Sequence, residues 1–334
     1  MANTNSYIYA GNLEKAMNFY FEAALAPSTR SSYRSGLNRY ILFCKRTYAT
    51  PFPLAEIVLQ LFVTSIANYV KFSTIKVYLC GIQYQSIVCG YSEKICAMPK
   101  LHYVMRGIRR SHPNNIIRRL PITPSHLREM IQFINESLFS DHDKALWAGL
   151  ILIAFFGLLR VSEYTCPSKN KFDPEFHLAP SDIKLSKCGN IISITIKASK
   201  TDPFRSGIKV RVCRIGGMLC PVDAIMKYMN YRGLSPGPFF ILSCGEVITR
   251  KFVAAFVTMT LPNDINLNTH SFRIGGASAA ASCGIPDSAI KILGRWSSDC
   301  YRRYIHLSDN SIKEWCDKIV QLESVTKIWD VKHI

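Results

Sequence analysis

The sequence predicts a mainly α-helical fold with one small antiparallel sheet. Apolar residues recur at helical spacing over most of the chain up to residue 159 and again after residue 220. Between residues 183 and 213 the pattern changes to short β-branched or alternating runs, which turn residues separate. The chain has 334 residues, which is long enough for two domains and a sizeable core. We therefore expect a helical N-terminal domain and a mixed α/β C-terminal domain.

Residues 1–112 are expected to form a bundle of five short helices. Residues 1–11 carry little periodicity and are interpreted as a flexible lead-in. Pairs of serine and threonine, and later Pro99, mark helix starts, because hydroxyl side chains cap free N–H groups and proline fits the first helical turn. The expected helices span residues 13–25, 28–44, 53–69, 73–88 and 99–110.

Residues 113–123, which contain two prolines and the dibasic pair Arg118-Arg119, are the expected linker. Residues 124–334 then form the second domain, which opens with a helix capped by Thr123. A buried apolar helix, a three-stranded antiparallel sheet and further helices complete it. The expected strands span residues 183–185, 191–197 and 208–213, and the expected helices span 124–134, 143–159, 220–231, 249–259 and 310–329.

The charge of the chain favours a polyanionic partner. It carries 41 Lys and Arg against 23 Asp and Glu, a net charge of +18. The first 120 residues alone hold 15 basic and 4 acidic side chains. We therefore expect the N-terminal bundle to contact nucleic acid most strongly, with ordinary solubility charge as the alternative. The candidate contacts on its helices are Arg30, Arg34, Lys76, Arg106, Arg109 and Arg110.

Several classes of protein do not fit the sequence. The twelve cysteines are scattered without metal-site spacing, so we interpret them as reduced packing residues of a cytosolic or nuclear protein. The N-terminus lacks the pattern of a signal peptide. The longest apolar run, residues 145–159, is too short to span a bilayer, so no membrane partner is expected. No carboxylate cluster suggests Mg²⁺, and no metal or other cofactor is expected.

The most informative stretch surrounds His270. His270 and Arg273 stand three residues apart, so both can reach one anion from the same helix face. We expect Asn268 or Thr269 to cap this helix, so that the helix dipole keeps the His270 imidazole neutral. The run of glycine, alanine and serine from Gly275 to Ala281 predicts a helix that its neighbours pack closely.

Downstream, the chain reads Gly294-Arg295-Trp296-Ser297-Ser298-Asp299 and then contains two tyrosines. The order His-x-x-Arg, then Gly and Trp, then Tyr resembles the active site of the tyrosine recombinase family. The residues from Gly294 to Asp299 are especially similar to recombinases of eukaryotic DIRS, Ngaro and Crypton mobile elements. The resemblance covers roughly residues 28–306. It implies a SAM-like core-binding bundle followed by the mixed α/β catalytic domain of the family.

The resemblance also implies the upstream half of a catalytic site. Arg160 and Glu163, in the pattern Gly-x-x-Arg-x-x-Glu, resemble the first family arginine and an acidic partner that orients it. Lys200 lies in the hairpin between the second and third expected strands, where the family carries its catalytic lysine. Lys197 is the alternative for this lysine, but it is still on the strand, so we prefer Lys200 and expect Lys197 to point to solvent or DNA.

The downstream half has two candidates for the nucleophile. Tyr304 belongs to a Tyr-x-His sequence like that of the family, so we prefer it to Tyr301. Tyr304 lies eight residues after Trp296, whereas the family spacing is usually nine. The catalytic set implied by the resemblance is Arg160, Lys200, His270, Arg273, Trp296 and Tyr304.

The implied function is site-specific recombination of double-stranded DNA for a mobile element, without metal, ATP or any other cofactor. The tyrosine forms a 3′-phosphotyrosyl bond, with His270 as general base and Lys200 as general acid. By the same resemblance, a homotetramer acts on two DNA sites in the nucleus. The helix 310–329 is expected to dock on a neighbouring protomer or to fold onto its own domain. The alternatives are a type IB topoisomerase and a catalytically silent DNA-binding regulator.

Overall fold

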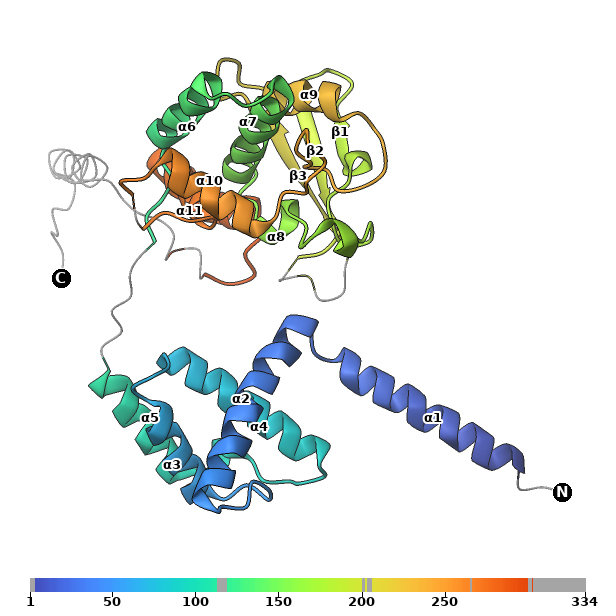
Figure 1. The fold of residues 1–334 in the computed structure, drawn as a ribbon, viewed down its shortest axis with the longest axis vertical. Coiled ribbons are helices and arrows are strands. Elements are labelled where there is room, and N and C mark those ends of the chain that lie inside the picture. The colour runs from blue at the N-terminus through green and yellow to red at the C-terminus, as the bar shows by residue number, and fades with distance from the viewer. Residues whose placement is uncertain are drawn as a thin grey trace, which may run out of the picture. The chain divides into compact units, whose positions relative to one another are not determined.

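The computed structural model describes residues 4–112, 119–199, 202, 206–264, 266–299 and 302 (Figure 1). These residues are mainly helical with one small antiparallel sheet, which confirms the predicted fold class. The chain divides into two compact units, Met1–Ile116 and Ile117–Ile334, and the division falls within the predicted linker. Each unit has its own hydrophobic core.

The described part of the first unit is a set of helices, and the first helix begins earlier than predicted. α1 starts at Thr4, so residues 4–11 are helical rather than a lead-in. No proline interrupts the chain before Pro27, and therefore nothing prevents the helix from extending upstream. The elements are α1 (Thr4–Ala23), α2 (Pro27–Thr47), α3 (Glu56–Ile66), α4 (Phe72–Val88), the 3₁₀ helix η1 (Ile95–Ala97) and α5 (Pro99–Ser111).

Two glycines let α2 and α4 approach closely. An added Cβ at Gly36 of α2 would lie 2.6 Å from the Cα atom of Tyr78 on α4. An added Cβ at Gly81 of α4 would lie 2.7 Å from the carbonyl oxygen of Tyr33. The packed helices leave their basic side chains outside the core. Residues buried in this core include Tyr40, Cys44, Leu59, Phe62, Val63, Ile75 and Ile82.

The second unit contains the sheet, whose strands lie in the order β1-β2-β3 with both neighbouring pairs antiparallel. The strand bounds agree with the prediction to within one residue. Buried isoleucines of β2 alternate with partly exposed residues, so one face of the sheet is buried. The elements are α6 (Pro124–Glu136), α7 (Asp141–Phe156), α8 (Val161–Tyr164), η2 (Lys169–Lys171), η3 (Pro180–Asp182), β1 (Ile183–Leu185), β2 (Ile191–Ile196), β3 (Ile208–Cys213), α9 (Pro221–Arg232), α10 (Arg250–Thr260), α11 (Ser271–Ser282) and α12 (Asp287–Leu293).

α7 is the central helix of the second unit and is buried along most of its length (Figure 1). The hydroxyl of Ser140 caps it by accepting a hydrogen bond from the Asp143 N–H at 3.2 Å. Gly157 ends it, so the helix stops three residues before the predicted end at residue 159. Arg160 therefore lies beyond the buried helix rather than at its last turn.

α11 is packed as closely as its small residues predict. An added Cβ at Gly275 would lie 1.9 Å from the carbonyl oxygen of Ile122, and one at Gly276 would lie 2.4 Å from that of Phe155. The Ile122 N–H also donates a hydrogen bond to the Ser271 carbonyl at 3.0 Å. The lack of side-chain bulk brings the start of α11 to the C-terminal end of α7.

The substitution Gly275→Ala is expected to lower the free energy of unfolding of the second unit by about 1–3 kcal/mol. The new methyl group has no room beside Ile122, so the backbone must move. Urea unfolding followed by tryptophan fluorescence measures this effect, because Trp147, Trp296 and the other two tryptophans all follow residue 116.

Gly107→Ala is the matched control for this substitution. Gly107 lies in α5, and an added Cβ there would meet no atom within 4 Å. The control should therefore leave the fluorescence transition unchanged. A Gly275→Ala protein as stable as the wild type contradicts the packing described for α11.

Within the described ranges, no helix is long and apolar enough to cross a membrane. The packing role predicted for the cysteines holds for Cys44, Cys166 and Cys220, which are buried. The other described cysteines are exposed, and the prediction is wrong for them. Their positions fall on outer faces of helices and strands or in loops.

Candidate active site

The turn between α7 and α8 presents Arg160. After Gly157 ends α7, Leu158 adopts a left-handed backbone conformation with φ of 47°. Arg160 then occupies the cap position at the N-terminus of α8. Its side chain is 16% exposed, so the guanidinium group lies at the edge of the core.

The carboxylate of Glu163 lies fully buried beside Arg160. Its Oε1 accepts hydrogen bonds from Arg160 Nη1 and Ser199 Oγ, both at 3.0 Å. Its Oε2 accepts from the Arg160 backbone N–H at 2.9 Å and lies 3.1 Å from Nη1 of Arg295. Burial opposes ionisation, but the charge of Arg295, followed by the N–H groups and charge of Arg160, outweighs it and lowers the pKa of Glu163. The ionised carboxylate therefore holds both arginines.

Arg273 of α11 contacts the residues that follow the C-terminal ends of α7 and α12. Its side chain is buried, with the residue 1% exposed. Nη1 donates to the carbonyl of Leu158, and Nη2 donates to that of Gly294. The guanidinium lies over the Trp296 ring at 4.3 Å from the ring centroid. Gly294 is needed here, because an added Cβ would lie 1.6 Å from the Trp296 ring.

His270 caps α11 rather than lying in its first turn. Its backbone N–H donates to Oδ1 of Asn268 at 2.8 Å, so one of the two predicted capping residues does bind here. Burial of the ring, followed by repulsion from Arg273 and from three further arginines, lowers the pKa of His270 to about 4. The imidazole is therefore neutral near pH 7, as predicted. Burial is the largest cause, and the arginines add to it.

In the free protein we expect His270 to stay neutral down to about pH 4. An unfolded histidine titrates near pH 6.5, so the unfolded chain binds this proton first, and His270 reduces folding stability as pH falls from about 6.5 toward 4. An NMR titration of the ring C–H signals measures the pKa, and the spectrum of His270→Gln assigns them. The variant should also lose less stability over that pH interval. A ring that titrates near pH 6.5 contradicts the described burial.

Three arginines to which the sequence analysis gave no role lie at this site. Arg119 and Arg250 are exposed, and both repel a positive charge on His270. Arg295 follows α12, and its side chain is 8% exposed. Two sequence signals could have indicated the first and the last of these: Arg119 belongs to the dibasic pair of the expected linker, and Arg295 belongs to the Gly-Arg-Trp sequence. Nothing in the sequence marks Arg250, which reaches the site through the fold alone.

The structure brings together guanidinium groups from separate segments of the chain. The Leu158 carbonyl accepts hydrogen bonds from both Arg273 and Arg295. Glu163 contacts both Arg160 and Arg295. Like charges repel at such short range, so an anion bound among these groups would stabilise them. Planar guanidinium groups are suited to bind phosphate oxygens in pairs.

Lys200, Tyr301, Tyr304 and the helix 310–329 lie outside the described residues, so their roles stay predictions. Ser199, the residue before Lys200, accepts a hydrogen bond from Arg160 Nη1 at 2.9 Å. The described part of the hairpin therefore reaches the site.

Lys197 is placed differently from the prediction. Its Nζ lies 2.6 Å from Oδ2 of Asp182, and its side chain is 23% exposed. It pairs within the unit instead of pointing freely to solvent or DNA, because η3 brings a carboxylate to the end of β2. Among the described residues, no three His, Cys, Asp or Glu side chains lie together so as to hold a metal ion.

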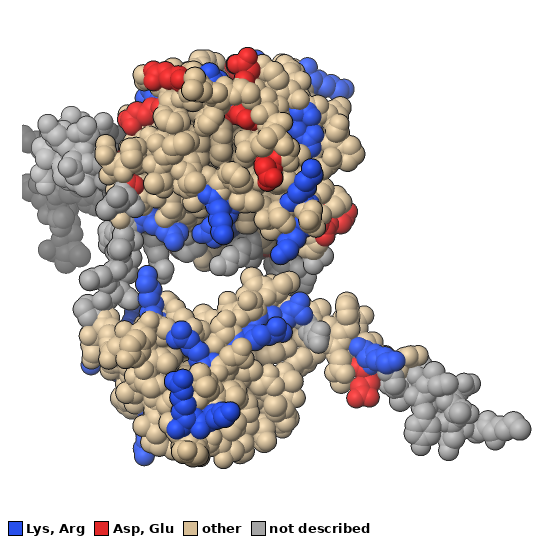
Figure 2. Space-filling view, viewed as in Figure 1, with Lys and Arg blue, Asp and Glu red and all other residues tan. Residues whose placement is uncertain are grey.

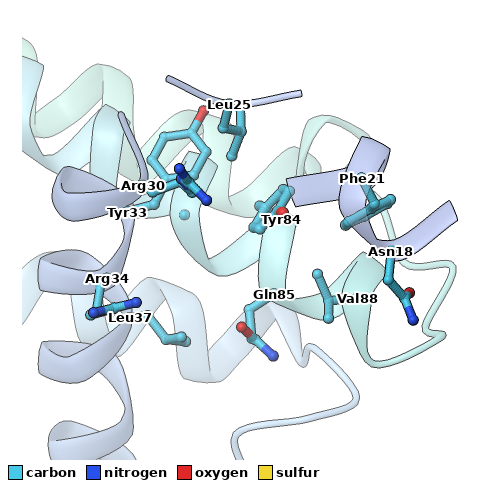
Figure 3. Close-up of a pocket in the computed structure, with 11 residues that line it drawn as sticks. Asn18, Phe21, Leu25, Arg30, Tyr33, Arg34, Leu37, Tyr84, Gln85 and Val88 are labelled. Carbon is cyan, nitrogen blue, oxygen red and sulfur yellow. The ribbon is translucent and has the colours of Figure 1, made fainter. Parts of the chain in front are cut away.

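The basic side chains predicted to contact DNA are exposed on the first unit. Arg30 and Arg34 line a groove of about 530 Å³ near the end of α1, between α2 and α4, together with Leu37 and the aromatic rings of Tyr33 and Tyr84 (Figure 3). In the view of Figure 2, this unit shows Lys and Arg over its surface, and an acidic side chain is visible on α1. Exposure is the first requirement for contact with a phosphate backbone. The exposed set is Arg30, Arg34, Lys76, Arg106, Arg109 and Arg110.

In the same view, Lys and Arg are visible on several parts of the second unit, including its edge near α8 (Figure 2). Acidic side chains are most visible over α6 and α7, whereas Lys and Arg line the edge near α8. That edge carries the turn with Arg160 at its start. The basic edge therefore accompanies the cluster of arginines.

No protein-family model matches the chain, and no curated protein matches it. Solved structures do match. The XerH site-specific recombinase, in a post-cleavage complex with palindromic difH substrate, is 14% identical with a TM-score of 0.60, over 86% of this chain and 78% of that one. The Tn1549 transposon integrase, in complex with circular intermediate DNA, is 12% identical with a TM-score of 0.60, over 94% and 98%.

A third solved structure agrees with these two. The lambda integrase dimer bound to a COC′ core site is 14% identical with a TM-score of 0.55, over 96% of this chain and 98% of that one. At these identities the comparison bears on the fold. The chain has the fold of the site-specific recombinases and integrases that its sequence resembles.

Proposed function

We propose that the protein is a site-specific DNA recombinase that cleaves and rejoins strands through a 3′-phosphotyrosyl intermediate. The observation that carries the proposal is the convergence of Arg160, Arg273 and a neutral His270 from separate segments of the second unit. The shared fold with DNA-bound recombinases and integrases supports it.

Strand cleavage needs an anionic phosphorus centre to accept a nucleophile. Arg160 and Arg273 bind the non-bridging oxygens and stabilise the charge that grows in the transition state, each by about 3–4 kcal/mol. Neutral His270 accepts the phenol proton as the Tyr304 oxygen attacks phosphorus. The bond from phosphorus to the 5′ oxygen breaks, and Lys200 gives that oxygen its proton. The products are a 3′-phosphate ester on Tyr304 and a free 5′ hydroxyl.

Rejoining reverses the same steps. A 5′ hydroxyl attacks the phosphotyrosyl bond, His270 returns its proton to the phenol oxygen, and Lys200 recovers a proton from the attacking hydroxyl. The ester conserves the energy of the broken bond, so the proposed reaction requires no ATP, metal or other cofactor. A hydroxyl from another strand exchanges the partners, and two such rounds between two duplexes complete recombination.

The proposal also covers the domains that bind DNA, the number of protomers and the place of the reaction in the cell. The N-terminal bundle, residues 1–112, binds DNA through its exposed basic side chains, and the catalytic domain spans residues 124–334. Four protomers act on two double-stranded DNA sites, with the helix 310–329 docked on a neighbour. The similarity of Gly294 to Asp299 to mobile-element recombinases supports a role in integration or excision, which takes place in the nucleus of a eukaryotic host.

Covalent capture on DNA tests this function. A pool of duplexes with a randomised core is nicked just 3′ of the possible cleavage positions, so that the short 5′-hydroxyl fragment diffuses away and the protein stays linked. A denaturing gel should show protein bound to DNA through a 3′ phosphate, and sequencing of the recovered DNA gives the target. Binding without any covalent adduct contradicts the proposal and favours a silent regulator. Exchange between two sites, set beside relaxation of a supercoiled circle, separates a recombinase from a topoisomerase.

A further inference from the structure

Arg295 occupies an unusual backbone position. It follows the end of α12 and adopts a left-handed conformation with φ of 56°. Glycine and asparagine adopt this conformation more readily than a residue with a long side chain. Its side chain is nevertheless 8% exposed, so an arginine has been buried where the backbone favours a smaller residue. Such a combination calls for a role of the side chain itself.

The contacts of the guanidinium indicate that role. Nη1 lies 3.1 Å from Oε2 of Glu163, and Nη2 donates to the Leu158 carbonyl at 2.8 Å. The Leu158 carbonyl also accepts a hydrogen bond from Arg273. Among the described residues, neither Nε nor Nη1 of Arg295 has a hydrogen-bond partner, so Nη1 meets Glu163 as an ion pair, while Nη2 makes the hydrogen bond to Leu158.

The geometry points to Arg295 as a positioning residue, which holds Glu163 against Arg160 and joins the segment before Trp296 to the turn between α7 and α8. This inference rests on the proposed function, since Arg160 is the group that would bind the scissile phosphate. Arg295 itself does not need to touch DNA. It acts by fixing the charge and position of the carboxylate that orients Arg160.

The groups around Glu163 show why its charge depends on Arg295 in particular. Arg160 and Tyr164 face it from its own turn, Ser199 faces it from the loop after β2, and Arg295 faces it from beyond α12. Of the groups that favour its ionised form, the charge of Arg295 acts most strongly, ahead of Arg160. Loss of Arg295 therefore leaves a buried carboxylate that takes up a proton at higher pH. A protonated Glu163 would then hold Arg160 less firmly.

Arg295 also lies next to open space. Together with Ser199 and Trp296 it lines a hollow of about 330 Å³ that extends to Ile208 at the start of β3. The pair formed by Arg295 and Glu163 is thus close to a surface that a substrate can approach. Arg295 therefore links the buried Glu163 carboxylate to the residues that line this hollow.

The test uses the full chain with Arg295→Met, Arg295→Lys and Arg295→Gly. A carbon-13 NMR titration of the Glu163 carboxyl needs no DNA: its pKa should rise by about one pH unit or more in Arg295→Met and less in Arg295→Lys. Glycine relieves the backbone, so Arg295→Gly should show the same rise if the guanidinium is what matters. An unchanged Glu163 titration in all three variants overturns the inference.

The second readout is the pH dependence of single-turnover cleavage on captured DNA. The acidic limb of the rate profile should move to higher pH in Arg295→Met, and the same substitution made in a Glu163→Gln background should produce no such shift. DNA affinity should stay within about twofold, because Arg295 is buried. An equal rate loss at every pH, in proportion to lost stability, would mean that Arg295 is only a structural residue.

Arg232→Met is the matched control. Arg232 is also an internal arginine, but its guanidinium donates to the Pro238 and Phe239 carbonyls. Its loss should lower stability without moving the acidic limb or the Glu163 titration. If the wild-type protein forms no adduct at all, the proposed function fails, while the NMR titration still decides whether Arg295 controls Glu163.

Discussion

Tyr304→Phe is expected to abolish the covalent adduct with DNA and leave DNA binding within about twofold of the wild type. The phenol oxygen is the atom that forms the phosphotyrosyl bond in the proposed reaction, so its removal leaves no nucleophile, while phenylalanine keeps the aromatic ring. The measurement is the denaturing gel of the captured complex, combined with an electrophoretic shift assay for binding.

Tyr301→Phe is the control that the sequence itself provides. It should retain the adduct, because we assign the nucleophile to the tyrosine of the Tyr-x-His sequence. Mass spectrometry of the captured peptide should then locate the DNA on Tyr304. An adduct that survives Tyr304→Phe and disappears with Tyr301→Phe would move the nucleophile to Tyr301. It would also mean that the spacing after Trp296 is shorter still.

Arg160→Ala is expected to slow single-turnover cleavage by roughly 10²–10³-fold, which is the usual effect of removing one fixed donor from a developing anion. Arg160 lies at the edge of the core, held by Glu163 and Ser199 through Nη1. Its other N–H groups can meet a phosphate. Arg160→Lys keeps the charge but loses the planar fork, so we expect a smaller but clear loss.

Arg128→Ala controls for the loss of an arginine from the same unit. Arg128 is exposed on α6 and forms no part of the arginine cluster. Its removal should leave the cleavage rate within about twofold of the wild type. A similar loss in Arg128→Ala and Arg160→Ala would show that general basicity, rather than the position of Arg160, supports cleavage.

Local sequence signals predicted most of the fold. β2 and β3 alternate around Ile192, Ile194 and Val212, and turn residues bound them, so their limits could be found without the rest of the chain. The start of α1 at Thr4 could not be found, because residues 1–11 carry little apolar periodicity. The early end of α7 depends on Gly157, whose added Cβ would meet the Ile153 carbonyl at 2.7 Å.

The proximity of the candidate site residues could be predicted where they are close in sequence. His270, Arg273 and Trp296 belong to one stretch, and their proximity follows from two short helices. Arg295 stood inside the same motif, but its role depends on Glu163, which the fold brings from a distant segment. No periodicity or spacing in one sequence can indicate such a pair.

The neutral state of His270 shows the same limit. The sequence predicted it from the helix dipole, which is a local property. The structure indicates burial as the main cause, followed by the charges of Arg273, Arg119, Arg160 and Arg250. Those charges come from four parts of the chain. They could be counted in the sequence but not placed around the ring.

The proposed function depends most directly on Arg160 acting on the charge of the scissile phosphate. The decisive measurement is the cleavage rate of wild type and Arg160→Ala on two matched duplexes, one with a phosphodiester and one with a neutral methylphosphonate at the cleavage position. If Arg160 acts in this way, the loss caused by Arg160→Ala falls from roughly 10²–10³-fold to about tenfold or less on the neutral substrate. An equal loss on both substrates would contradict it.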